Sequence, residues 1–398
     1  MSPSLRKTLI ALLLIICFIS VGRMAWTYYD VLRTKKAAEA ERRRKDKLTV
    51  NSLLERQDAA APMRDGQFPC VFVAVADPKA APPELGKCSV PVDRSVDVDR
   101  FEVDLRYGNF LVRQTDLYMN DVFDVPLTRT YNSGDYIHPN RRHAFGINTN
   151  HPFDIAPLGT RNPYTYEMLV LEDGDYLFFD RVSTGTSYLD AVYQHTETST
   201  RFYKAVTKWN GNGWTTSLTD GTKIEFPEAY GSTNMAQGAA TAISDGQGNK
   251  LELVRDGQRN LMEIRTPHGR TMKFKCDEQS RIVSAEDDHG QWARYQYNSN
   301  GMLTDVVFSS SRERHYTYDG HLMTRVENEQ HNVLVRNTYR GTTLVQQDFG
   351  NGQIFSYEYS STSDGPYAES VLVTMPSGEK IEVEVASSVP ELVKHPRD

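Results

Sequence analysis

The chain has 398 residues, of which 39% are hydrophobic, and it contains 26 glycines and 21 tyrosines. This size and composition suit one to three globular units built mainly from strands and turns. The net charge of −7 is unevenly distributed, since residues 1–47 hold 11 Lys and Arg against 4 Asp and Glu, which leaves −14 for residues 48–398. We expect no nucleic-acid partner, because phosphate binding needs clustered positive charge on the body.

A long apolar run lies near the N-terminus, from Thr8 to Gly22, and an aromatic stretch extends it to Tyr29. The whole segment is long enough to cross a bilayer. Arg23 stands where a signal-peptide cleavage site would need a small residue. We therefore predict a stub at residues 1–7, an uncleaved single-span anchor at residues 8–29, and a charged helical stalk at residues 30–61. The stalk is rich in Ala, Glu, Lys and Arg and lacks glycine and proline.

Residues 62–100 form a predicted Pro- and Ala-rich linker that contains Cys70 and Cys88. A disulfide between these two cysteines would hold down a segment with few apolar residues, and it would persist only outside a reducing compartment. The alternative, that both are ordinary reduced residues, stays open. Eight Lys and Arg residues follow the anchor closely, and by the positive-inside rule alone they would place the body in the cytoplasm.

Residues 101–240 are predicted to be a β region made of hairpins. Asp173-Gly174 and Asp220-Gly221 are hairpin-turn signals, and each precedes a run rich in apolar residues. Three short motifs stand out in this region. They are Tyr107-Gly108-Asn109-Phe110, Thr115-Asp116-Leu117 and Arg129-Thr130-Tyr131-Asn132-Ser133.

Residues 241–385 contain a repeat with a period of close to 21 residues, and residues 386–398 form a polar tail. Equivalent positions fall at Asp256, Asp277, Asn298, Asp319, Arg340 and, one residue early, Ser360. Apolar and polar residues alternate within a unit, which indicates a strand with one buried face. Two strands and two turns fit one period, so each unit is a predicted hairpin that must stack on its neighbours.

The unit Tyr295-Gln296-Tyr297-Asn298-Ser299-Asn300-Gly301-Met302-Leu303 resembles the YD repeat of RHS (rearrangement hotspot) proteins, and the motifs before it resemble the segment that precedes those repeats. The resemblance covers residues 101–360 and implies an all-β fold. We expect stacked antiparallel hairpins in a twisted, open or partly rolled sheet, behind a transmembrane helix and stalk. No self-cleaving core signature or toxin follows Ser360, and six repeats are too few to close a shell. Because members with such repeats are generally exported, we expect the body to lie on the extracytoplasmic side of the membrane, in the periplasm or at the cell surface. A cytoplasmic body is the alternative.

The repeat tyrosines are the candidate site residues. They are Tyr295, Tyr297, Tyr316, Tyr318, Tyr357 and Tyr359. Exposed aromatic rings on a sheet could stack on sugars, but the strict period favours a structural ladder that packs the hairpins together. In the same way Cys276 occupies an inward aromatic position and is predicted to pack.

The sequence offers little that indicates catalysis. His138, His143 and His151, with Asp135 and Asp154, match no tetrahedral metal site. There is no nucleophile elbow, phosphate-binding loop or Cys-His arrangement, so we predict no enzyme, cofactor or metal. The predicted function is a membrane-anchored, non-enzymatic structural or interaction module. Its expected partners are a protein or a second copy bound through sheet edges. The alternative is a cell-surface carbohydrate-binding protein.

Overall fold

The computed structural model describes residues 70–72, 99–135, 143–160, 164–196, 201–229, 232, 234–350, 352–360, 368 and 370–384. The predicted anchor, stalk, tail and Cys88 lie outside these ranges. No helix within them has the length and apolar character needed to cross a membrane. The helical turns described are two short 3-10 segments, η2 (Pro152–Asp154) and η3 (Met235–Gly238). Apart from these two segments, the regular secondary structure of the described residues is β-strand, as predicted.

A sheet of five strands, here called the inner sheet, is built from the segment before the repeats. Its strands are β1 (Cys70–Phe72), β2 (Asp99–Asp104), β3 (Asn109–Asn120), β4 (Asp124–Asn132) and β5 (Thr149–Asn150). They pair in chain order, with β1 parallel to β2 and the other pairs antiparallel. The hairpin of β3 and β4 is the longest pairing in the inner sheet, from Leu111 with Asn132 to Asn120 with Asp124.

The other 21 strands form a second sheet, here called the barrel, in which each strand pairs antiparallel with the next along the chain. Before the repeats come β6 (Ala156–Gly159), β7 (Tyr166–Val170), β8 (Tyr176–Arg181), β9 (Val192–Gln194), β10 (Val206–Trp209), β11 (Gly213–Ser217), β12 (Lys223–Pro227) and β13 (Ala242–Ser244). The first repeats give β14 (Lys250–Arg255), β15 (Leu261–Arg265), β16 (Thr271–Cys276), β17 (Ile282–Asp287), β18 (Trp292–Tyr297), β19 (Leu303–Phe308) and β20 (Glu313–Asp319). The last strands are β21 (Leu322–Asn328), β22 (Val333–Arg340), β23 (Thr343–Asp348), β24 (Ile354–Ser360), β25 (Ser370–Thr374) and β26 (Lys380–Glu384).

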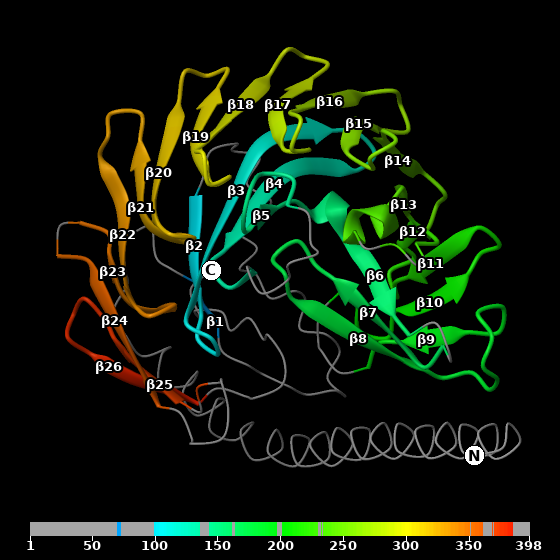
Figure 1. The fold of residues 1–398 in the computed structure, drawn as a ribbon, viewed down its shortest axis with the longest axis horizontal. Coiled ribbons are helices and arrows are strands. Elements are labelled where there is room, and N and C mark those ends of the chain that lie inside the picture. The colour runs from blue at the N-terminus through cyan, green and yellow to red at the C-terminus, as the bar shows by residue number, and fades with distance from the viewer. Residues whose placement is uncertain are drawn as a thin grey trace, which may run out of the picture.

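The prediction of stacked antiparallel hairpins is confirmed, and the sheet is rolled around the inner sheet. Its strands pair in chain order from β6 to β26, and β25 and β26 lie across the molecule from β6 (Figure 1). The segment before the repeats contributes β6 to β13 to the same sheet. Figure 1 shows the strands arranged around the inner sheet, with β2, β3 and β4 across the middle.

The curvature of the barrel has a local cause that recurs in the repeats. The pairing register shifts between Gln296 and Tyr297, and again at the equivalent places Lys275/Cys276, Thr317/Tyr318 and Thr338/Tyr339. A bulge bends its strand and increases the right-handed twist. One bulge at the same place in successive repeats therefore turns the sheet steadily in one direction.

The turns show how the Asp or Asn of each repeat works. The side chains of Asp256, Asp277 and Asn298 each accept hydrogen bonds from backbone N–H groups two and four residues later, at 2.8–3.0 Å. Each Asp or Asn therefore caps its own turn. The left-handed backbone of the turn falls three residues later, at Arg259, Ser280 and Gly301, with φ of 68°, 64° and 83°.

A single hydrophobic core joins the two sheets. β3 packs against β17, β18 and β23 on the inside of the barrel. Aromatic pairs link the layers: the ring centroids of Phe145 and Tyr295 lie 4.7 Å apart, and those of Tyr131 and Tyr318 lie 6.1 Å apart. The inner sheet thus fills the inside of the barrel with side chains from the chain itself.

Candidate functional site

The repeat tyrosines point into the barrel, toward the inner sheet. Tyr295, Tyr316 and Tyr357 are buried, whereas Tyr297, Tyr318 and Tyr359 are half-buried and pack against the core. Two hydroxyl groups of the second set donate to the carbonyl of an adjacent strand, from Tyr297 to Ile282 at 2.5 Å and from Tyr318 to Leu303 at 2.8 Å. Each tyrosine therefore contributes ring packing to the core, and several add a hydrogen bond between strands.

A buried polar cluster, here called the arginine junction, connects the ladder to the inner sheet. The guanidinium of Arg129 on β4 donates from Nε to Asp116 Oδ2 at 3.0 Å and from Nη2 to Gln114 Oε1 at 2.6 Å, both on β3. Nη2 also donates to the Tyr316 hydroxyl at 3.0 Å. The Tyr295 hydroxyl donates to Asp116 Oδ2 at 2.9 Å. All five side chains are at most 4% exposed, so the junction is shielded from solvent.

Burial and pairing fix the protonation states at the arginine junction. Burial disfavours a charged guanidinium, but attraction to the Asp116 carboxylate more than offsets it and holds the pKa of Arg129 well above its ordinary value. Burial is also the main reason that the pKa of Tyr295 lies well above its ordinary value, and the Asp116 charge adds to the effect. Neither group exchanges a proton near neutral pH, so the junction holds the two sheets together without acting as an acid or base.

A second polar cluster, here called the acidic junction, joins β2 and β3 to the turn between β7 and β8. Arg106 contacts Asp104 at 2.5 Å and Asp175 at 3.4 Å. Arg113 contacts carboxylates from both sheets: Glu102 at 3.0 Å, Asp173 at 2.8 Å and Glu172 at 3.5 Å. Five carboxylates face two guanidinium groups in this cluster. Burial, followed by repulsion from Asp173, raises the pKa of Asp175 to about 7.

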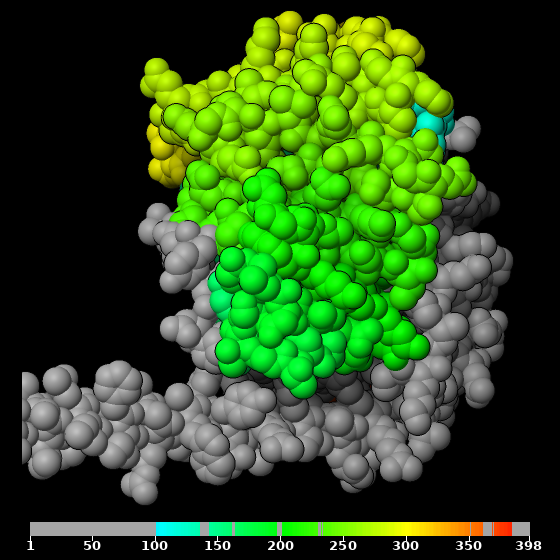
Figure 2. Space-filling model, turned by 90° about the vertical axis from the view of Figure 1, so that its right-hand side faces the viewer, coloured from blue at the N-terminus to red at the C-terminus, as the bar shows by residue number. Residues whose placement is uncertain are grey.

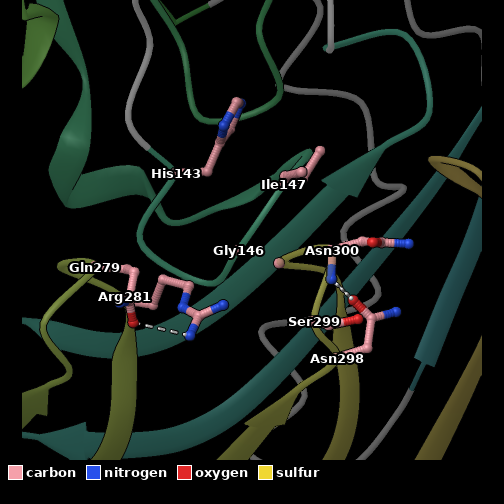
Figure 3. Close-up of a pocket in the computed structure, with 9 residues that line it drawn as sticks. His143, Gly146, Ile147, Gln279, Arg281, Asn298, Ser299 and Asn300 are labelled. Carbon is pink, nitrogen blue, oxygen red and sulfur yellow. Dashed lines mark hydrogen bonds between the residues drawn. The ribbon is translucent and has the colours of Figure 1, made fainter.

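A groove lies where the loop of residues 143–147 meets two repeat turns. Its volume is about 530 Å³. Figure 3 shows Gln279 and Arg281 on one side of it and Asn298, Ser299 and Asn300 on the other. Arg281 is paired with Asp277 at 2.7 Å, and its guanidinium lies 4.4 Å from the centre of the Tyr297 ring. Because its cation is already paired, the groove presents mainly neutral amide and hydroxyl groups.

The two described histidines of the candidate metal cluster contact different groups. His143 Nε2 lies 2.9 Å from Asp135, whereas His151 is buried and its Nδ1 accepts a hydrogen bond from the Phe153 N–H at 3.2 Å. His138 lies outside the described residues. Among the described residues, Asp287, Asp288 and His289 do place ligand atoms within 4.8 Å of one another. However, the Arg270 guanidinium lies 2.7 Å from Asp288 and supplies the positive charge there.

The cysteine predictions are tested only in part. Cys70 is in β1, and Cys88 lies outside the described residues, so the proposed pair stays a prediction. Cys276 is a half-buried residue that packs against the core, in the position predicted for it.

Sequence reasoning missed both junctions. The motifs that contain Asp116 and Arg129 stood out for their spacing, and a buried ion pair could have been suspected from an Asp and an Arg within adjacent strands. Their tyrosine partners lie 179 and 187 residues further along the chain. No local pattern connects residues at that separation.

A curled sheet of tyrosine-bearing hairpins around an inner sheet defines a YD-repeat shell. Comparison with protein families agrees, since the family described as Teneurin YD-shell matches residues 204–334 and Domain of unknown function (DUF6531) matches residues 102–178. The chain belongs to the RHS/YD-repeat proteins. No curated protein sequence matches it.

Solved structures with similarity to this chain include three crystal structures of TcdB2-TccC3. The first is 10% identical, covers 72% of this chain and 17% of its own, and has a TM-score of 0.29. The TcdB2-TccC3-TEV structure is 9% identical, with coverages of 69% and 19% and a TM-score of 0.22. The form without the hypervariable C-terminal region is 10% identical, with coverages of 69% and 22% and a TM-score of 0.27. This chain therefore spans about a fifth of the length of those chains.

Proposed function

We propose that this RHS/YD-repeat protein is a non-enzymatic interaction module, held at a membrane by residues 8–29 and working through the outer surface of its barrel. The observation that carries the proposal is the filled interior. Arg129 and Asp116 of the inner sheet bond to Tyr295 and Tyr316 of the barrel wall in a cluster that is at most 4% exposed. Space occupied by the chain's own side chains does not hold cargo.

The carbohydrate alternative depended on exposed repeat aromatics. Tyr295, Tyr316 and Tyr357 are between 2% and 4% exposed, and a sugar ring needs an accessible aromatic face on which to stack. The half-buried members of the ladder also face the core. The outer surface is therefore the surface that we assign to partners.

The proposal is tested by locating partner contacts on the full chain in its own cells. A photo-crosslinking residue is placed on the outer face of the repeats, at exposed Lys273 or Lys275, and in a matched variant at inward Phe274 on the same strand. We expect adducts from the outer positions alone. Adducts formed from Phe274 would show an occupied interior and overturn the proposal.

The membrane part is tested separately. Carbonate-washed membranes should retain the full chain, and deletion of residues 8–29 should release it, because a single apolar span anchors a protein effectively irreversibly. Retention of the deletion variant would show that residues 8–29 are not the anchor. Protease added to intact cells reports on which side of the membrane the body lies.

A further inference from the structure

The outer face of the barrel changes character along the chain. On the repeats it carries charged and polar side chains, such as the exposed Lys273 and Lys275 on β16 and Arg294 on β18. On β7 and β8 it carries Tyr166, Met168, Tyr176 and Phe178. Tyr166 and Phe178 lie 5.8 Å apart between ring centroids, and Tyr176 and Phe178 lie 5.4 Å apart. This part of the barrel is at the right in Figure 1 and faces the viewer in Figure 2.

Beside this face stands a loop of residues 182–190 that is held in one conformation by Arg181. The arginine donates to the carbonyls of Ser183 at 3.3 Å, Thr184 at 3.2 Å and Ser187 at 3.1 Å. It also pairs with Asp190 at 2.5 Å, while its own side chain is only 7% exposed. The loop is therefore organised without any partner, and binding would not have to order it.

The ordered loop presents apolar side chains to solvent. Leu189 is 70% exposed, Val182 is 58% exposed and Tyr188 is 38% exposed. The Tyr188 ring packs edge-on against Trp209, with centroids 4.9 Å apart. Exposed Leu and Val side chains on an ordered loop contribute no burial of apolar surface to folding. Clusters of such side chains mark interaction surfaces.

One basic residue lies beside the loop: Lys208, which pairs with Val192 in the sheet, is exposed on the outer face. Arg201 and Lys204 are also exposed, but they belong to the connection between β9 and β10, at the end of that hairpin away from the loop. The charge of Asp190 is paired with Arg181, and Asp180 is an exposed carboxylate on β8.

We propose that residues 182–190, with Trp209 and Lys208, form a surface that inserts into an anionic phospholipid bilayer. Exposed Leu and Val flanked by Tyr and Trp are the side chains that enter the interface between headgroups and acyl chains, and the nearby Lys208 is attracted to anionic lipid. This inference rests on the membrane anchor proposed above. Residues 30–69 between that anchor and β1 would span roughly 60 Å even as a continuous helix, so the loop is within reach of the same membrane.

The test uses the full chain reconstituted into vesicles, with an environment-sensitive fluorophore attached at exposed Thr186 in the loop through an unnatural amino acid. A matched chain carries the fluorophore at exposed Lys273 on the repeats. In vesicles that contain phosphatidylglycerol, we expect blue-shifted emission at residue 186 and about twofold quenching by lipids with brominated acyl chains, because an inserted loop lies about 5–10 Å deep. The probe at residue 273 should stay in water.

Two variants test the chemistry on the Thr186-labelled chain. Leu189→Asp should abolish the quenching, and Lys208→Glu should weaken it most when anionic lipid is present. Both positions are exposed, so thermal unfolding should be unchanged. Co-flotation with vesicles reports the anchor independently of the probe. A chain that fails to float refutes the anchor. A chain that floats while residue 186 stays in water in every lipid refutes the inserting loop. An apolar signal that disappears on dilution of protein per vesicle would assign the surface to a second copy and also overturn the proposal.

Discussion

Removal of the Arg129 guanidinium is the most direct test of how the two sheets are held together. Arg129→Met keeps much of the side-chain volume but leaves the Asp116 carboxylate, which is 0% exposed, without its cation. Breaking a buried ion pair by removing one partner costs about 3–5 kcal/mol. At about 2 °C per kcal/mol for a body of this size, the melting temperature should fall by roughly 6–10 °C.

The size of the effect should depend on pH in a defined direction. Without Arg129, burial raises the pKa of Asp116 in the folded state above its ordinary value, so the variant should lose stability as pH rises above about 4. The wild-type protein has Arg129 in place, so it should lack this loss of stability with rising pH.

Thermal unfolding of the purified full chain at several pH values measures these effects. Tyr316→Phe is the matched control: it removes one hydroxyl from the same cluster and should cost only about 1 kcal/mol. The double variant Arg129→Met/Asp116→Leu should recover most of the loss, because it leaves no unpaired buried charge. A cost below about 1 kcal/mol for Arg129→Met would refute the arginine junction as the main polar link between the sheets.

Three further predictions concern other parts of the fold. The folded pKa of Asp175 is raised to about 7, so wild-type stability should decline from about pH 4 to pH 7. Asp175→Asn should remove this decline, and unfolding of both proteins at pH 5 and pH 8 measures it. Ser280→Gly should raise stability by up to about 1 kcal/mol, since Ser280 has φ of 64° where Gly301 serves in the next repeat; a destabilised variant would contradict this. Gly146→Ala should lower the melting temperature, because a Cβ there would lie 2.5 Å from the Gly301 carbonyl and φ is 81°. Gly378→Ala is the control: its φ of 83° is similar, but no atom lies within 4 Å of the Cβ, so it measures the backbone strain without the clash.

The hairpins could be predicted because their causes are local. Met272 and Phe274 alternate in the sequence with Thr271, Lys273 and Lys275, and both are buried. The Asp or Asn before each turn caps backbone groups within four residues of itself, so one repeat contains everything its turn needs. The inward position of the tyrosines also follows from the period, because residues at equal spacing on stacked strands face the same side.

Tertiary structure decided how far the sheet extends around the interior and what fills that interior, since both depend on contacts between distant segments. β6 to β13 extend the sheet of the repeats, and no single repeat determines how many strands precede it. Arg129 meets Tyr316 across 187 residues, and the Arg181 loop brings Leu189 and Lys208 onto one surface. Periodicity determines which face of a strand is buried, but only the folded chain determines what lies against that face.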